Sequence, residues 1–392
     1  MPPPPILNLN WETDSPYNKH QRDACINRVN WDALLVYASS RNSSKPCIML
    51  DQSTSGGVHL IRLLYFPDRV PASGAEPKKK EEIWIARIQL HPSTPESQSR
   101  LQSEINTMNL IRTRSTFPIP KIYGYSLNDN DNDSHGTNAS FALLSFLPGS
   151  SAMDADGGWT DVAGIQIGTV LNFKNDDGNE SFDIGPLPGI GGPFSTAHEF
   201  FEAWAVYAES RFPQSESEIR ECMRGSPFEE EIMKSISAFP KRLRELAAQG
   251  RISIPEYNTG PFPLYHPDLY HSNIIIDDAY KILGVLDWEG ACSVPWEIVQ
   301  PPLFIHNLPR AMDDPENYDV DGWPKDEDTR VRVEERGEYV GFVREMEQET
   351  GTDGRLSNVL GNGNLQGLAY AVQVFLDPGK MGFYTRVLDL FR

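Results

Sequence analysis

Four polar residues stand close together in one stretch of the chain, in an order that could serve phosphoryl chemistry. Residues 264–289 read LYHPDLYHSNIIIDDAYKILGVLDWE and contain His266, Asp268, Asn273 and Asp287. Two oxygen ligands, from Asn273 and Asp287, beside a third carboxylate suit a hard cation such as Mg²⁺, which proteins usually hold together with substrate phosphates. Phosphoryl transfer is therefore the first hypothesis.

Two short apolar runs must position these side chains. Residues 273–276 and 282–286 are short and rich in β-branched side chains, and the polar residues 277–280 separate them. This pattern predicts two strands of a hairpin. Such a hairpin would return Asn273 and Asp287 to the same open end.

Farther upstream, an arginine lies within an apolar strand pattern. Over residues 83–90 the alternation places Arg87 on the same face as Ile83 and Ile85. An arginine in such a position needs a partner.

The next segment offers that partner. Thr94 as N-cap and Pro95 at the first position predict a helix with an apolar stripe, beside which Glu104 lies; the stripe is Leu101, Ile105, Met108 and Ile111. We expect Glu104 to pair with Arg87. The alternative is two unrelated surface charges.

The remaining pattern predicts two unlike lobes. Strands are expected over residues 47–50, 58–66, 83–90, 116–125 and 140–147, after which Pro148-Gly149 marks a boundary. Helices are expected over residues 162–173, 198–212, 229–248, 329–349 and, in two pieces, 365–390. The predicted organisation is an N-terminal extension (1–45) with a short helix near Trp31, a first lobe (46–148) and a helical second lobe (149–392).

Two loops in the first lobe have an open interpretation. Gly56 and Gly57 lie between strands, where they could lay backbone N–H groups over phosphates or simply close a hairpin. The lysine-ended segment 71–80 is expected to be a solvated loop.

Composition limits the partners and the compartment. The 392 residues carry a formal net charge of −20, which disfavours nucleic acid and anionic membrane surfaces and would favour a cationic ligand. No apolar run approaches the roughly 18 residues of a membrane span. Four scattered cysteines and the absence of a secretory signal pattern indicate reduced thiols and a cytoplasmic protein.

The joint spacing carries a family resemblance. His266-x-Asp268, then Asn273, then a strand ending in Asp287-Trp-Glu resembles the catalytic loop and metal-binding aspartate of protein kinases. The flanking His-Pro-Asp-Leu and Gly-Val-Leu-Asp-Trp-Glu resemble the aminoglycoside phosphotransferase and choline kinase-like family. Less specific support comes from WIARI at 84–88, IPKIYG at 119–124 and LSFLPG at 144–149, so the resemblance covers about residues 47–300.

This resemblance implies an α+β, bilobal protein kinase-like fold. Its first lobe would be an antiparallel sheet that binds ATP, and its mainly helical second lobe would carry the catalytic loop and the acceptor site. Asp268 would be the catalytic base, and Asn273 and Asp287 would hold Mg²⁺ on the nucleotide phosphates. The implied activity is transfer of the γ-phosphate to a hydroxyl of a small molecule, such as a cationic amine of aminoglycoside or choline type.

The resemblance also assigns nucleotide contacts in the first lobe. Arg87 stands where the family usually has a lysine, and Glu104 stands where the pairing glutamate lies. The backbone of Ser145, Phe146 and Leu147 would contact the adenine edge. Arginine keeps the charge, but its planar head differs from an ammonium group.

Two alternatives remain open from the sequence. A pseudokinase would bind nucleotide and transfer nothing. A metal-dependent hydrolase could instead use His266, Asp268 and His271 as ligands for zinc or iron, although it would leave Asn273, Asp287, Arg87 and Glu104 without roles.

Overall fold

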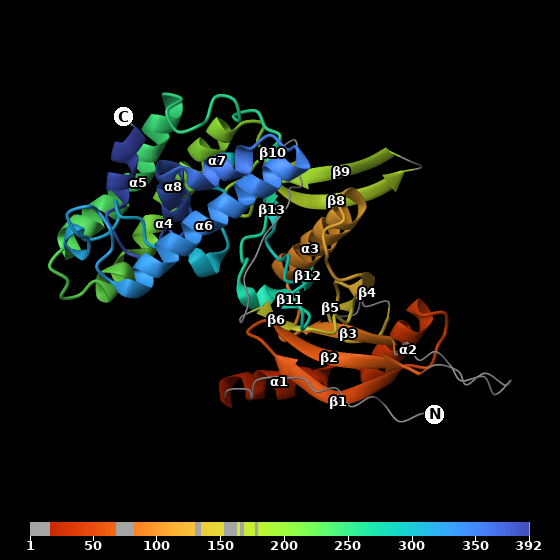
Figure 1. Cartoon of the computed structure of the whole chain (residues 1–392). Coiled ribbons are helices and arrows are strands. Elements are labelled where there is room, and N and C mark those ends of the chain that lie inside the picture. Colours follow the sequence, from red (N-terminus) through yellow and green to blue (C-terminus); the bar gives the residue numbers. More distant parts are fainter. Residues whose placement is uncertain are drawn as a thin grey trace. The chain divides into compact units, whose positions relative to one another are not determined.

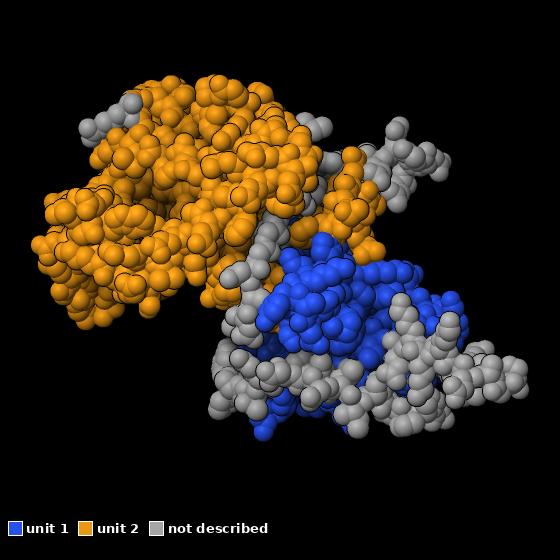
Figure 2. Space-filling model, viewed as in Figure 1, with its two compact units in different colours: residues 1–105, 118–150, 275–289 blue, residues 106–117, 151–274, 290–392 orange. Residues whose placement is uncertain are grey.

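The computed structural model describes residues 16–67, 82–129, 135–152, 163–164, 168–176 and 179–391. The predicted loop 71–80 lies outside these residues. The chain divides into two compact units, coloured separately in Figure 2: Met1–Ile105, Pro118–Ser150 and Ile275–Glu289 form the first, and Asn106–Phe117, Ser151–Ile274 and Gly290–Arg392 form the second. The boundaries that the sequence predicts at residues 45 and 148 remain predictions.

The first unit is built on a five-stranded antiparallel sheet (Figure 1). Its strands follow the order β1-β2-β3-β5-β4. They are β1 (Ile48–Ser55), β2 (His59–Phe66), β3 (Glu82–Gln89), β4 (Ile122–Ser126) and β5 (Phe141–Ser145). All five strands predicted from alternating apolar residues are present.

One face of this sheet supports a core. Trp84, Ala86 and Ile88 of β3 are buried in it, together with residues of α1 (Pro16–Arg28) and α2 (Trp31–Arg41). The other face carries Ile83, Ile85 and, next along the strand, Arg87. The helix predicted near Trp31 is therefore confirmed as α2, whereas α1 was not predicted.

Helix α3 (Pro95–Arg114) begins where the capping pattern predicts. Thr94 Oγ1 accepts a hydrogen bond from Ser97 N at 3.2 Å, which satisfies one of the free N–H groups of the first turn. Glu104, Ile105 and Met108 are buried. The predicted apolar stripe therefore faces the interior, and the carboxylate of Glu104 is buried beside it.

The second unit is mainly helical. Its helices are α4 (Ala197–Cys222), α5 (Glu229–Ala248), α6 (Glu327–Thr350), α7 (Arg355–Gly361), α8 (Gly363–Gln373) and α9 (Tyr384–Leu388). Aromatic side chains such as Phe201, Phe239 and Tyr384 form its core. Among the described residues, no helix combines the length and apolarity needed to cross a membrane.

One predicted helix is wrong. Residues 163–164 form β7 (Ala163–Gly164) and residues 168–176 form β8 (Gly168–Asp176), where the sequence predicted a helix over 162–173. The sequence of β8, GTVLNFKND, contains a glycine and β-branched residues that favour a strand. β8 pairs with β9 (Asn179–Gly185) in a sheet that also contains β10 (Phe262–Tyr265) and β13 (Cys292–Ser293).

The predicted hairpin is present. β11 (Ile274–Ile276) and β12 (Ile282–Val285) are neighbours in a three-stranded sheet with β6 (Ser150–Ser151). β11 begins directly after Asn273, and β12 ends two residues before Asp287. The chain is thus α+β, with an antiparallel sheet in one unit and a mainly helical second unit, as the sequence predicts.

Candidate active site

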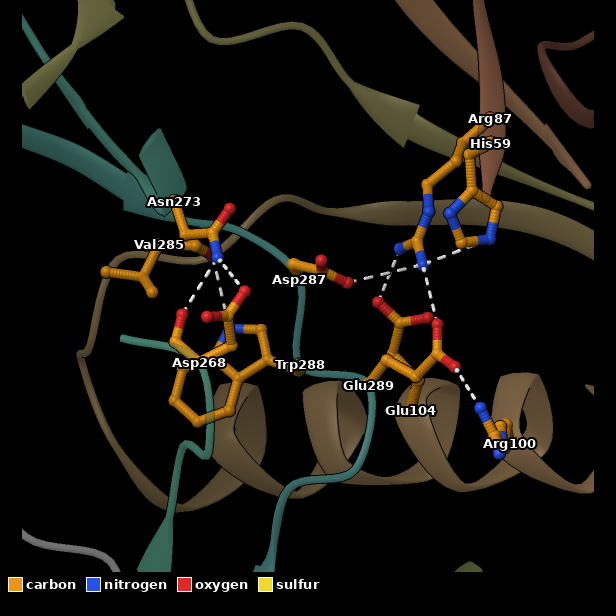
Figure 3. A network of polar contacts seen from close by, with 10 residues as sticks. All are labelled: His59, Arg87, Arg100, Glu104, Asp268, Asn273, Val285, Asp287, Trp288 and Glu289. Carbon is orange, nitrogen blue, oxygen red and sulfur yellow. Dashed lines mark hydrogen bonds and ion pairs between the residues drawn. The ribbon is translucent and has the colours of Figure 1, made fainter. Parts of the chain in front are cut away.

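Arg87 and Glu104 form an ion pair inside the first unit (Figure 3). Arg87 NH1 donates to Glu104 Oε1 at 2.5 Å, and the two side chains are only 11% and 2% exposed. Burial acts to lower the pKa of Arg87, but the carboxylates of Glu104, Asp287 and Glu289 together raise that pKa overall, with Glu104 contributing most among them. The pair predicted from the strand and helix patterns is therefore present, and the guanidinium of Arg87 is charged.

Asp287 adds a second carboxylate beside Arg87. Its Oδ1 lies 3.6 Å from Arg87 NH2, yet this buried oxygen has no hydrogen-bond partner within the described residues. Asp287 also has φ of 59°, in the left-handed region that aspartate tolerates better than most residues. A buried carboxylate oxygen without a donor is costly by itself, and it fits a cation ligand.

Glu289 and Arg100 extend this cluster. Glu289 Oε2 lies 3.9 Å from Arg87 NH2, and Glu289 Oε1 lies 3.5 Å from Arg100 NH1. Figure 3 shows Arg87 reaching toward Glu104, Asp287 and Glu289 from the strand side. Arg100 was not predicted as a site residue, although it lies one helical turn before Glu104 on α3, where the two residues are neighbours on the helix surface.

His59 is a further residue that sequence reasoning missed. Its Nε2 lies 3.4 Å from Arg87 NH2. Burial, followed by the charge of Arg87, lowers the pKa of His59 to about 3. The neutral imidazole can therefore accept a hydrogen bond from the guanidinium. The strand register could have indicated this contact, because His59 shares a face of β2 with Ile61, which pairs with Arg87.

These side chains line a cavity within the first unit. The cavity measures about 190 Å³, and His59, Arg87, Arg100, Glu104 and Glu289 contribute to its wall. Thr94, Ser97 and Ser140 add hydroxyl groups. The cavity is therefore polar and charged, and it suits part of a charged ligand better than an apolar one.

The residues predicted to contact adenine, Ser145, Phe146 and Leu147, lie at the end of β5 and directly after it. Ser145 N donates to Lys121 O at 2.8 Å and Phe146 N to Ile83 O at 3.4 Å, so both groups already have acceptors. Phe146 packs beside Ile83 and Ile85 on the open sheet face. For Leu147 N, the described part of the chain offers no acceptor. Leu147 is thus the residue of the three whose N–H remains available.

Asp268 and Asn273 lie in the second unit, on the loop before β11. Asn273 Nδ2 donates to Asp268 O at 2.8 Å and to Asp268 Oδ2 at 3.0 Å. This geometry directs the amide nitrogen toward the aspartate and leaves the amide oxygen of Asn273 as an acceptor. The hydrogen bond from Asn273 fixes Asp268 Oδ2, while the Asp268 side chain stays exposed to solvent.

The histidines of this loop have separate surroundings. His266 is buried, and its Nδ1 accepts the Asp268 N–H at 3.2 Å. The His271 ring stacks on Phe304, with 4.2 Å between ring centroids. No group of three histidine, cysteine, aspartate or glutamate side chains with metal-binding geometry occurs in the described residues. The set His266, Asp268 and His271 therefore does not form the site that a zinc or iron hydrolase needs.

Comparison with known protein families places the chain in one of them. Residues 78–296, more than half of the chain, match the model of the phosphotransferase enzyme family that includes the aminoglycoside phosphotransferases. The chain belongs to this family, as its resemblance at the catalytic loop predicts.

Individual relatives are distant. Clavilactone A biosynthesis cluster protein Y of Ampulloclitocybe clavipes is 23% identical over 234 residues, which cover 54% of this chain and 53% of that protein. The chain thus spans about half the length of this curated relative. Among solved structures, a macrolide 2′-phosphotransferase type I has 14% identity and a TM-score of 0.36, covering 92% of this chain and 96% of that chain. An ethanolamine kinase of Plasmodium vivax has 13% identity and a TM-score of 0.33, covering 88% and 81%.

Proposed function

We propose that this chain is a small-molecule kinase that transfers the γ-phosphate of ATP to a hydroxyl group. The observation that carries the proposal is the state of Asp287, whose buried Oδ1 lacks a hydrogen-bond donor beside the Arg87 and Glu104 pair. An oxygen held in this way is suited to a divalent cation on nucleotide phosphates.

In this proposal the first unit binds the nucleotide. Arg87, oriented by Glu104 and His59, would contact phosphate oxygens, and a guanidinium can do so with two parallel N–H groups. Leu147 N–H would donate to the adenine edge, while Ser145 and Phe146 hold that segment in place. Arg100 would contribute a second positive charge in an otherwise acidic protein.

The second unit would supply the base and a metal ligand. Asp268 would accept the proton of the attacking hydroxyl, with Asn273 fixing one of its carboxylate oxygens. Asn273 Oδ1 and Asp287 would hold Mg²⁺, which when bound neutralises charge on the phosphate oxygens. Asn273 and Asp287 flank the β11–β12 hairpin in the chain, which supports a common role.

The acceptor class and the compartment are inferred from charge and thiol state. A net charge of −20 favours a cationic hydroxyl compound, such as an amino alcohol or an amino sugar. All four cysteines are unpaired, which is typical of a reducing cytoplasm.

A second candidate is a pseudokinase that binds nucleotide without transferring phosphate. It is favoured by the number of carboxylates near Arg87, because Glu104, Asp287 and Glu289 all compete with phosphate for this one guanidinium. Against it, the residues proposed for metal binding and base catalysis are all present.

Two measurements separate these candidates. Thermal unfolding with ATP, with and without Mg²⁺, tests nucleotide binding, since a ligand at 100 times its Kd stabilises by about 2.7 kcal/mol. ADP release from Mg-ATP with a panel of amino alcohols, amino sugars and neutral sugars then tests transfer. A kinase gives stabilisation and acceptor-dependent ADP, whereas a pseudokinase gives stabilisation alone. Stabilisation by Zn²⁺ without any by Mg-ATP would contradict both.

A further inference from the structure

A second cavity lies wholly within the helical unit. It measures about 870 Å³, within the range of roughly 300–1,000 Å³ usual for small-molecule sites. Its wall is formed by α6, by the segment 307–311, by Tyr318 and the neighbouring residues 321–324, and by the ends of α7 and α8. α7 packs against both α6 and α8, and these helices are drawn in blue in Figure 1.

Much of the cavity wall is apolar. Val333 and Val340 come from α6, Leu360 from α7, and Trp323 and Tyr318 from the segment before α6. Trp323 is 44% exposed, so a ligand could still bury much of its aromatic surface. Burial of tryptophan surface contributes strongly to binding. The cavity therefore offers a surface for an apolar or aromatic body.

The charged residues in the wall are mostly arginines. Arg310, Arg336 and Arg344 line the cavity, and Asp321 is its one carboxylate. None of the three arginines has a carboxylate within ion-pair distance among the described residues. Arg310 instead lies over the Tyr318 ring at 5.4 Å, and Arg336 donates to Gln366 Oε1 at 2.9 Å.

This distribution is unusual for such an acidic helix. α6 has the sequence EDTRVRVEERGEYVGFVREMEQET, yet none of its glutamates lines the cavity, whereas Arg336 and Arg344 do. Burial lowers the pKa of Arg336, because desolvation penalises its charge and Gln366 is a neutral partner. A mostly buried cation without a counterion is costly unless another group compensates it.

Asn307 adds an unsatisfied donor to the same wall. Its Oδ1 accepts from Arg332 Nε at 3.1 Å, and because arginine can only donate, this contact fixes the orientation of the amide. Its Nδ2 is then buried without an acceptor in the part of the chain that the structure describes. The polar groups of the cavity are thus predominantly donors, which match an acceptor-rich ligand.

We infer that this cavity binds an organic anion with an apolar body, such as an aryl or alkyl carboxylate. The carboxylate would lie against Arg336 and Asn307, and the body against Trp323 and the valines of α6. The inference concerns a ligand site of the helical unit and does not depend on phosphoryl transfer. The ligand inferred for this cavity is an anion, whereas the net charge of the whole chain favours a cationic ligand.

Calorimetric titration of the full chain tests this inference with two probes of equal length and opposite charge, 4-phenylbutyrate and 4-phenylbutylammonium. We expect saturable binding of the carboxylate and none of the ammonium compound at the same site. Removing a charged hydrogen-bond partner typically costs a factor of about ten or more in affinity, so Arg336→Met should weaken 4-phenylbutyrate by at least that factor. Arg211→Met, on an exposed arginine of α4, should leave it within about twofold.

A second pair of variants keeps the test independent of charge removal. Gly337 lines the cavity and a Cβ there meets nothing within 4 Å, so Gly337→Leu adds volume at the cavity wall without a clash at its base. Gly341 lies one turn farther along α6, is equally open and does not line the cavity, so Gly341→Leu is the matched control. Leucine is also the better helix former, which protects the fold of both variants.

Loss of 4-phenylbutyrate binding in Gly337→Leu, with binding retained in Gly341→Leu, supports the site. Equal affinity for the two probes, unchanged affinity in Gly337→Leu, or no saturable binding of the carboxylate up to millimolar concentration would each overturn it.

Discussion

Arg87 is surrounded by groups that fix both its position and its charge. It pairs with Glu104 at 2.5 Å, lies 3.6 Å from Asp287 and contacts the neutral ring of His59. These contacts hold the guanidinium in one orientation, and each partner depends on the others for its own charge or hydrogen bond.

Removing Arg87 alone should destabilise the chain more than removing the pair. In Arg87→Met, Glu104 would remain buried without its cation, and breaking a buried pair typically costs about 3–5 kcal/mol. The double variant Arg87→Met/Glu104→Leu removes both charges and should recover at least half of that loss. Urea unfolding of the two variants and the wild type measures the difference. A double variant no more stable than the single one would contradict the pair as described.

His59 should make the chain sensitive to mild acid. Burial and the charge of Arg87 lower the pKa of His59 from 6.5 to about 3. Between these pH values the imidazole is protonated in the unfolded chain and neutral in the folded chain. The stabilisation that His59 contributes is therefore complete above pH 6.5 and is lost as pH falls from 6.5 toward 3. The free energy of unfolding decreases by up to about 1.4 kcal/mol per pH unit over this range. His59→Gln keeps an acceptor near Arg87 and should flatten this slope.

The control for this measurement must share the other titrating groups. Burial lowers the pKa of His306 to about 4, and burial raises that of Glu297 to about 7, which gives an opposite slope as pH falls from 7 to 4.5. Both remain in His59→Gln, so the difference between wild type and variant isolates His59. Identical slopes for wild type and His59→Gln would refute the role given to His59.

At the scale of elements, the segment after β5 and the β11–β12 hairpin approach each other closely. A Cβ at Gly149 would overlap the carbonyl oxygen of Ile276, and one at Gly284 would press on Leu147. Val285 N also donates to Pro118 O at 3.0 Å. Glycines at these two positions therefore allow the hairpin to support the segment proposed to contact adenine.

Gly149→Ala tests how much stability depends on the close packing of the β11–β12 hairpin against the segment after β5. The overlap with a backbone atom must be relieved by moving β11, and overpacking of this kind typically costs about 1–3 kcal/mol. Gly56→Ala is the control, because a Cβ there meets nothing within 4 Å. Thermal unfolding should separate the two variants, and Gly149→Ala should also raise the KM for ATP. Equal melting temperatures would show that the hairpin adjusts without cost.

The elements also show what the sequence could predict. Alternating strands, the capped helix α3 and the hairpin were foreseen because each has a local pattern, and Arg87 and Glu104 followed from them. The strand β8 was mistaken for a helix because its short apolar run fits both periods. His59, Glu289 and Arg100 were not assigned from the sequence, because their contacts follow from the pairing of β2 with β3 and from how the chain packs around Arg87.

At the scale of the whole molecule, two preferences for charge coexist. The net charge is −20, yet arginines line both cavities. In the first unit, Arg87 and Arg100 stand beside three glutamates of the cavity wall. In the second unit, Arg310, Arg336 and Arg344 outnumber the single carboxylate of the wall. An acidic chain that binds anionic ligands must concentrate its cations locally in this way. The first cavity belongs to the proposed nucleotide site and the second to the inferred anion site, and both proposals require cations held locally against the acidic background.

The most direct test of the central claim is ADP release from Mg-ATP by Asp268→Asn and Asp287→Asn, measured with the acceptor that gives most turnover in the wild type. Both variants should lose at least about a hundredfold in rate, in keeping with the usual contribution of a general base or of metal-held phosphate. Asp278→Asn, an exposed carboxylate on the same hairpin, should retain wild-type turnover. Turnover within tenfold of wild type in either Asp268→Asn or Asp287→Asn, or transfer that persists without a divalent cation, would contradict the proposed kinase mechanism.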